Sequence, residues 1–121
     1  MLCGPIAVES ATGIDRWSVV LRIRAAREAR GRQISLRGGT DRDELKAAAH
    51  ELGWRMRQVF QNRRVRLGYL AKRIKKGRWI FRQRGHFFGV ASGRDLRILA
   101  SGAPNANLIT HAWRLTPLRH Q

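Results

Sequence analysis

Basic side chains interleaved with aromatic ones dominate the middle of the 121-residue chain. The segment from Leu52 to Arg94, both included, contains thirteen Lys and Arg residues and no Asp or Glu. The whole chain has a formal net charge of +17 at pH 7. A folded domain with this charge repels itself unless an anion neutralises it, and the phosphates of a nucleic acid can do so. The sequence therefore predicts a protein that binds nucleic acid, either alone or within a larger nucleoprotein complex.

Two segments are expected to carry the binding chemistry, a basic helix over residues 63–76 and basic, aromatic strands over residues 78–88. Cationic side chains release counterions when they neutralise phosphates, and exposed rings can stack on bases for roughly 1–3 kcal/mol each. Because a basic helix can follow a duplex backbone without exposed rings, duplex DNA is slightly favoured over RNA or single strands. The candidate phosphate contacts are Arg55, Arg57, Arg63, Arg64, Arg66, Lys72, Arg73, Lys75, Lys76, Arg78, Arg82 and Arg84. The candidate stacking residues are Tyr69, Trp79 and Phe87.

Cleavage of RNA is the competing hypothesis. His86 or His111 could act as the acid and base, and Arg82 or Arg84 could stabilise the charge of a phosphorane-like transition state. The predicted order of helices followed by a meander is similar in outline to small RNA-cleaving toxins of the RelE class, and this resemblance implies a ribonuclease. Scattered histidines without paired carboxylates are more typical of structural and surface positions. The prediction is therefore a non-enzymatic protein with no catalytic residues.

A protein partner is the third hypothesis. The basic face could occupy the acidic groove of another protein, as an inhibitor or accessory factor of a nucleic-acid-handling complex does. Size and charge permit this role. A membrane surface is not expected as a partner, because the basic helix lacks a large exposed apolar face.

No cofactor or metal is expected. The carboxylates cluster only at Asp41, Asp43 and Glu44, which is the usual arrangement at a helix start, where the helix dipole favours acids. Cys3 is the only cysteine, so neither an internal disulfide nor a cysteine-based zinc site can form from this chain. Residues 1–14 lack the pattern of a secretory signal, and no run of eighteen apolar residues occurs. We expect a cytoplasmic protein.

The elements that position these residues follow from the hydrophobic pattern. Residues 17–24 and 33–37 alternate between apolar and polar side chains, which predicts an N-terminal β-hairpin. A rival interpretation makes residues 15–30 one amphipathic helix. Thr40 is expected to cap the next helix, whose apolar side chains recur at spacings of three and four as far as Phe60.

The second half predicts one more helix and several strands. The basic helix over residues 63–76 ends at Gly77. Alternating segments at 79–82, 88–90 and 96–100, separated by turn residues, predict a three-stranded meander. Residues 101–107 read as a loop, and residues 108–115 as a last strand or a short helix.

These elements predict a single small α+β domain over residues 15–116. It consists of the N-terminal β-hairpin, two helices, and then an antiparallel β-meander. The helices are expected to pack against one face of the sheet. Residues 1–14 are expected to form a flexible N-terminus, and residues 117–121 a frayed C-terminus.

Overall fold

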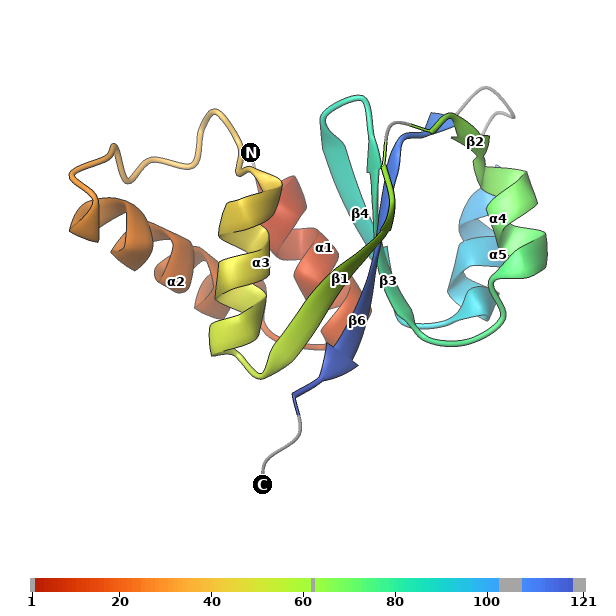
Figure 1. The fold of residues 1–121 in the computed structure, drawn as a ribbon, viewed down its shortest axis with the longest axis horizontal. Helices are drawn as coiled ribbons and strands as arrows, with labels where there is room; N and C mark the ends of the chain where they lie inside the picture. The colour runs from red at the N-terminus through yellow and green to blue at the C-terminus, as the bar shows by residue number, and fades with distance from the viewer. Residues whose placement is uncertain (1, 62, 103–107, 119–121) are drawn as a thin grey trace.

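The protein is layered around a four-stranded sheet, as Figure 1 shows. The computed structural model describes residues 2–61, 63–102 and 108–118. Its helices are α1 (Cys3–Thr12), α2 (Arg16–Ala29), α3 (Arg42–Glu51), α4 (Leu67–Arg73) and α5 (Gly93–Gly102). Its strands are β1 (Trp54–Phe60), β2 (Val65–Arg66), β3 (Arg78–Gln83), β4 (His86–Val90), β5 (Leu108–Ile109) and β6 (His111–Pro117). No helix in this described part has the length and apolar character needed to cross a lipid bilayer.

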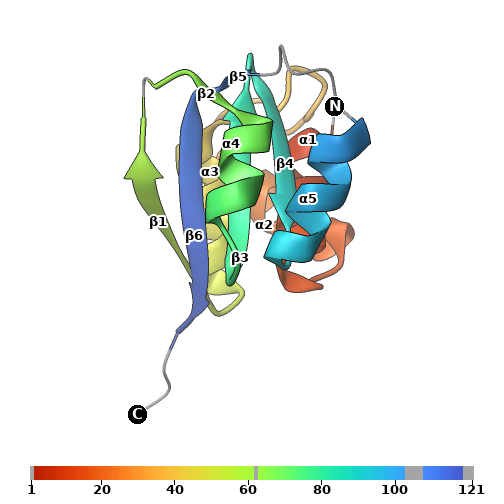
Figure 2. The same ribbon diagram turned by 90° about the vertical axis from the view of Figure 1, so that its right-hand side faces the viewer.

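The sheet has the strand order β1-β6-β3-β4, and every neighbouring pair is antiparallel. This confirms a small α+β domain, but helices cover both faces of the sheet rather than one. Helices α1 and α3 lie on one face with α2 outside them, and α4 and α5 lie on the other (Figures 1 and 2). Both faces attract helices because β3 and β6 are apolar on both sides. Ile80 and Trp113 point to the α1 side, and Phe81 and Ala112 to the α4 side.

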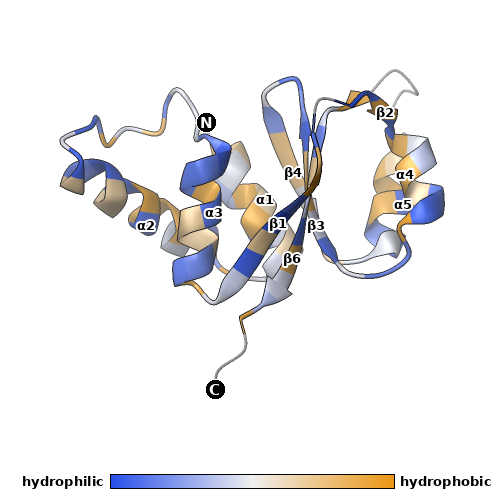
Figure 3. Cartoon of the chain, in the orientation of Figure 1, coloured by the Kyte–Doolittle hydropathy of each residue, from blue (hydrophilic) through white to orange (hydrophobic). Residues whose placement is uncertain are grey.

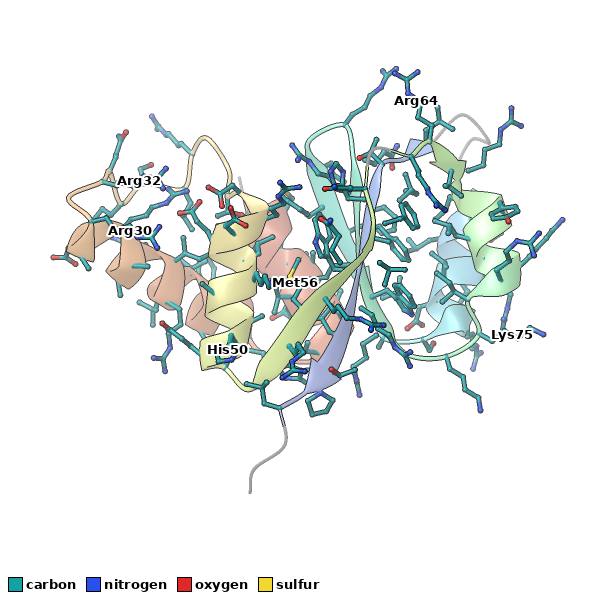
Figure 4. The ribbon with its side chains drawn as sticks, viewed as in Figure 1. Arg30, Arg32, His50, Met56, Arg64 and Lys75 are labelled. Carbon is teal, nitrogen blue, oxygen red and sulfur yellow. The ribbon has the colours of Figure 1, made fainter. Side chains whose placement is uncertain are left out.

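Apolar side chains of the helices complete the two cores. Figure 3 shows apolar segments in α1, α4 and α5, three of the helices that border the sheet. Met56 lies between β1 and the helices of the α1 side and is 1% exposed (Figure 4). The sheet therefore separates two hydrophobic clusters, and the strands between them are held from both sides.

The predicted N-terminal hairpin is wrong, and the rival helix is correct. Residues 16–29 form α2, which begins after the cap residue Asp15. Val19, Val20 and Ile23 are buried at helical spacing, whereas Leu21 remains 65% exposed. The alternating pattern favoured a strand because apolar residues lie on both sides of α2. Packing against α1 and α3 selects the helix instead.

The expected flexible N-terminus is also wrong, because residues 3–12 form α1 inside the core. Ala7, Val8 and Ala11 are almost fully buried. Their small side chains let α1 lie directly on β4, where a Cβ at Gly89 would collide with the carbonyl oxygen of Ala7. Small side chains contribute little to a hydrophobic periodicity, so the sequence pattern did not predict this helix.

Helix α3 begins one residue later than expected and ends much earlier. Asp41, not Thr40, is the cap, and it forms a capping box with Glu44. The helix stops at Glu51 because Gly53 adopts a left-handed backbone with φ 93°. The following residues pair with β6 as β1, so the apolar stripe expected to continue to Phe60 belongs to a strand.

In the second half the basic helix is shorter than predicted. Helix α4 covers only residues 67–73, so Arg63 and Arg64 precede it. The first two strands of the meander are confirmed as β3 and β4, joined by a turn in which Arg84 and Gly85 both have positive φ. The third predicted strand is wrong, because α5 covers residues 93–102 and buries Leu96 against α4.

Residues 108–115 were predicted to form either a last strand or a short helix. The strand is confirmed, and it consists of β5 and β6. Residues 103–107 of the predicted loop and residues 119–121 of the predicted frayed end lie outside the described residues.

A buried ion pair joins α2 to α3. The Arg27 guanidinium donates to both carboxylate oxygens of Glu44, at 2.5 and 2.9 Å, and also to the backbone carbonyls of Ser35 and Gly39. Glu44 accepts a further hydrogen bond from the Asp41 backbone N–H. Almost every polar atom of the pair is therefore satisfied, as burial of two charges requires.

Removing one partner of this pair should destabilise the fold. We expect Glu44→Leu to lower the free energy of unfolding by about 3–5 kcal/mol at pH 7, because it leaves the Arg27 charge buried without a partner. The double variant Arg27→Met/Glu44→Leu should recover much of this loss. Urea denaturation measures both, and an unchanged midpoint in the single variant would contradict the role of the pair.

The same pair sets a pH dependence. The hydrogen bond from Arg27 holds the pKa of the Glu44 carboxyl below its ordinary value, despite burial. The stabilisation is fully present above the ordinary carboxyl pKa of about 4.3 and is lost as the pH falls towards the lowered one. In urea denaturation between pH 7 and pH 3, wild type should lose more stability than the double variant.

The contact between α1 and β4 predicts a glycine requirement. Gly89→Ala should cost about 1–3 kcal/mol of stability, because the new methyl group meets the α1 backbone. Gly68→Ala is the matched control in α4, where a Cβ meets nothing within 4 Å. It should stabilise the protein by about 0.4–1 kcal/mol in thermal denaturation. Equal effects of the two substitutions would show that α1 does not pack on β4.

Candidate nucleic-acid interface

Charge is divided unequally between the two halves of the chain. Residues 1–51 carry nine basic and seven acidic residues, whereas residues 52–121 carry sixteen and one. The ion pairs of the described residues, Glu9 with Arg16, Arg22 with Glu51 and Arg27 with Glu44, all join helices α1, α2 and α3. The sheet and the α4–α5 layer therefore carry cations that have no acidic partner within the described part of the chain.

Three of these cations lie on a part of the sheet that no helix covers. Helices α4 and α5 lie over β3 and β4 and leave most of β1 and the C-terminal part of β6 uncovered on that side (Figure 2). Arg55, Arg57, Arg114 and Thr116 line a shallow groove of about 260 Å³ there. The antiparallel register places Arg57 opposite Arg114 and Arg55 opposite Thr116. We call Arg55, Arg57 and Arg114 the sheet-face arginines.

Trp79 extends this row towards α4. It lies opposite Arg114 on β3, with the guanidinium carbon 6.0 Å from the ring centroid. The ring stacks on Phe81 at 5.9 Å, and its Nε1–H donates to the Lys76 carbonyl at 3.1 Å. Gly77, with φ 92°, makes the tight turn that brings this loop beside Arg114. The sheet-face arginines therefore join the basic loop after α4.

The predicted phosphate contacts do not form one continuous face. Arg64 and Lys75 project from opposite ends of this half of the molecule (Figure 4). All of the candidates from Arg63 to Lys76 are exposed. Lys72, Arg73, Lys75 and Lys76 belong to the α4 end and the loop beside Trp79, whereas Arg63, Arg64 and Arg66 lie around β2. Arg84 is in the exposed β3–β4 turn.

Two candidate arginines have structural contacts instead. Arg78 is half-buried, donates to the Ala11 carbonyl at 2.9 Å and lies over the Trp54 ring. Arg82 is half-buried against Phe87 on the α1 side of the sheet. Neither side chain is on the face that carries the sheet-face arginines.

The candidate stacking rings are also less available than predicted. Phe87 is 3% exposed and packs on Trp113, so its proposed contact with a base is wrong. Tyr69 is half exposed, but the Arg73 guanidinium lies 4.0 Å from its ring centroid. Trp79 is half-buried.

Arg114 and Thr116 are the site residues that sequence reasoning missed. Each is a single polar residue in a largely apolar segment, without a charge run to mark it. Only the pairing of β6 with β1 places them beside Arg55 and Arg57. The alternation of residues 112–116 was the available signal, since it puts positions 114 and 116 on one face.

A larger cavity lies on the α1 side of the sheet. It measures about 980 Å³ and is bounded by the start of α1, residues 32–44, the β3–β4 turn and the start of β6. His111 and Arg82, two residues of the ribonuclease hypothesis, face each other here in the β3–β6 register. His86 and Arg84 are exposed and do not line the cavity.

His111 is held on two sides. Its Nδ1 lies 2.8 Å from the Thr110 hydroxyl, and its ring stacks on Trp113 at 5.6 Å. Burial lowers the pKa of His111, and the positive charges of Arg82 and Arg42 lower it further. The imidazole is therefore mainly neutral at pH 7. No group of three His, Cys, Asp or Glu side chains in the described ranges could hold a metal ion.

No protein-family model, curated protein or solved structure matches the chain.

Proposed function

We propose that this chain is a cytoplasmic protein that binds nucleic acid through phosphate contacts and does not cleave it. The binding surface is centred on the sheet-face arginines and includes Lys72, Arg73, Lys75 and Lys76 beside them. Arg63, Arg64, Arg66 and Arg84 extend it as a second basic group at the β2 end. Duplex DNA remains slightly favoured over RNA.

The main observation behind this proposal is that Arg57 and Arg114 lie opposite each other on neighbouring strands. Like charges directly opposite each other on neighbouring strands destabilise a sheet. No acidic side chain of the described residues lines the groove that holds them. Phosphate oxygens in the groove would neutralise both guanidiniums and convert the repulsion into charge-assisted hydrogen bonds.

The surroundings of the aromatic rings support backbone contacts over stacking. Phe87 is buried, and the Tyr69 ring is covered on one side by Arg73. Recognition of single strands depends on exposed rings, whereas contacts to a duplex backbone need only cations. The arrangement therefore favours a duplex without sequence-specific readout.

The repulsion predicts a salt-dependent gain in stability. Arg57→Gln should raise the free energy of unfolding by up to about 1 kcal/mol in low salt, and the gain should shrink as NaCl screens the charges. Arg24→Gln, on the exposed surface of α2, is the control and should have a smaller effect. Thermal denaturation from 10 mM to 500 mM NaCl measures this, and a gain independent of salt would contradict the electrostatic cause.

Binding itself is tested by removing the sheet-face arginines together. Arg55→Gln/Arg57→Gln/Arg114→Gln should weaken duplex binding roughly tenfold or more at 100 mM NaCl, alike for unrelated sequences. It should also flatten the salt dependence by about one unit per lost phosphate contact. Fluorescence anisotropy with single- and double-stranded DNA and RNA measures affinity, and the RNA is sized on a gel afterwards.

A charge-matched control distinguishes binding at a defined site from attraction by the net charge of the protein. Arg24→Gln/Arg30→Gln/Lys46→Gln removes the same charge from the exposed surface of α2, its C-cap and α3, and it should retain most of the affinity. The quadruple variant of Lys72, Arg73, Lys75 and Lys76 to Gln should weaken binding as the first triple variant does. Equal losses in the two triple variants would contradict a defined site, and shortened RNA would contradict a purely binding role.

A further inference from the structure

The cavity on the α1 side of the sheet contains cations that the proposed duplex surface does not use. Arg32, Arg42 and Arg82 line it, and none of their guanidiniums makes a hydrogen bond or an ion pair within the described part of the chain. The α2–α3 connection, the start of α3 and the β3–β4 turn bound the cavity at one end of the molecule (Figure 1). At about 980 Å³ it has the size of a small-molecule site.

Strand register places Arg82 and His111 side by side in this cavity. They lie directly opposite each other on β3 and β6, and such pairs have Cβ atoms about 4.5–5.5 Å apart. The Arg82 guanidinium carbon lies 5.7 Å from the centre of the Phe87 ring, which also lines the cavity. The His111 ring stacks on Trp113 at 5.6 Å. Both side chains are therefore held on the cavity side of the sheet.

The Thr110 hydroxyl determines which nitrogen of the neutral His111 ring carries the proton. Because this hydroxyl donates its hydrogen to the Arg82 carbonyl oxygen at 3.2 Å, it accepts the hydrogen bond from Nδ1–H at 2.8 Å. Nε2 is then the unprotonated nitrogen, and no hydrogen bond of the described ranges involves it. A proton added to Nε2 makes it a charged donor for an anion.

The charges that act on the imidazole are positive. Burial lowers the pKa of His111 most, and the positive charges of Arg82 and Arg42 lower it further. Besides these two arginines, the charged and titratable groups that line the cavity are Cys3, Arg27, Arg32, Asp41, Asp43 and Glu44. The pairing of Glu44 with Arg27 leaves three arginines and two aspartates around the space. An anion beside His111 is therefore attracted by more positive than negative charge.

Three donors from three elements match the oxygens of a phosphate monoester. Arg42 belongs to α3, Arg82 to β3 and His111 to β6. A monoester has three terminal oxygens and about 1.5 to 2 negative charges at pH 7, whereas a phosphate within a nucleic-acid backbone has two such oxygens and a single charge. Guanidiniums can bind two of these oxygens at once through parallel N–H···O bonds. The cluster therefore fits a terminal phosphate better than a backbone phosphate.

We propose that Arg42, Arg82 and His111 form a binding site for a phosphate monoester, supplied either by the end of a nucleic acid or by a free nucleotide. The two guanidiniums bind the phosphate oxygens, and protonated Nε2 of His111 donates to another. Because a nearby anion favours the charged imidazole, the ligand raises the pKa of His111. The site lies on the opposite side of the sheet from the sheet-face arginines and does not depend on duplex binding.

The test measures binding of adenosine 5′-monophosphate to the full chain by isothermal titration calorimetry in a phosphate-free buffer. The monophosphate should bind, and adenosine should bind at least about tenfold more weakly. Arg42→Gln and Arg82→Gln should each weaken binding about tenfold or more, because each removes a charged donor. Lys46→Gln is the matched control, since it removes the same charge from α3 one turn later and outside the cavity. It should retain wild-type affinity.

Histidine NMR signals provide a second readout at the site itself. Adenosine 5′-monophosphate should raise the pKa of His111 by about one pH unit or more, and it should leave that of His86, which lies outside the cavity, unchanged. The loss of one signal in His111→Asn assigns it. Equal changes at both histidines would contradict a defined site.

Two oligonucleotides of one sequence distinguish the sources of the phosphate. If a 5′-phosphorylated strand binds more tightly than its 5′-hydroxyl counterpart, and Arg42→Gln removes the difference, the ligand is a nucleic-acid end. If only the mononucleotide binds at the cavity, the ligand is a free nucleotide.

Three outcomes would overturn the proposal: equal affinity for adenosine and its monophosphate, equal losses in Arg42→Gln and Lys46→Gln, or an unchanged pKa of His111. Circular dichroism of every variant identifies unfolding. The triple variant of the sheet-face arginines should keep its affinity for adenosine 5′-monophosphate, so failure of this site is distinguished from failure of duplex binding.

Discussion

The Arg27–Glu44 pair is the interaction on which the N-terminal half of the structure depends. It ties α2 to α3, and through Ser35 and Gly39 it also fixes the long connection between these helices. That connection has no regular structure of its own, yet it forms one wall of the large cavity. A single buried guanidinium thus supplies the hydrogen bonds that a strand or helix would otherwise provide, and it does so at the cost of burying two charges.

The sheet separates two regions that differ in how far their charges are paired. On the α1 side, acids and bases are paired between helices, and the sheet-facing surface is apolar. On the α4 side, the arginines of β1 and β6 face outward with no acid in their groove. Because a layer of strands separates the two faces, an anion bound by the sheet-face arginines would not contact the ion pairs of the α1 side.

The sequence predicts the charge and the hydrophobic period of individual segments well. It predicts less well which segments pack or pair with each other. The β3–β4 hairpin was recognisable because Arg84-Gly85 interrupts two alternating runs, and the α3 start was recognisable from its acids. Residues 16–29 were ambiguous because their apolar side chains fit both a strand and a helix, and only packing on α1 and α3 decides between them. The site was harder to predict, since Arg114 joins Arg57 only through strand register.

The position of β6 has a consequence for how the chain reaches this structure. β6 is the last described strand, but it lies inside the sheet, between β1 and β3. Until it is in place, β1 has no neighbour and β3 is paired only with β4. During synthesis, at roughly 5–20 residues per second, the chain as far as Pro117 must leave the ribosome before the sheet can close. For that interval the basic segment from Leu52 to Arg94 lacks the complete sheet that buries its apolar side chains.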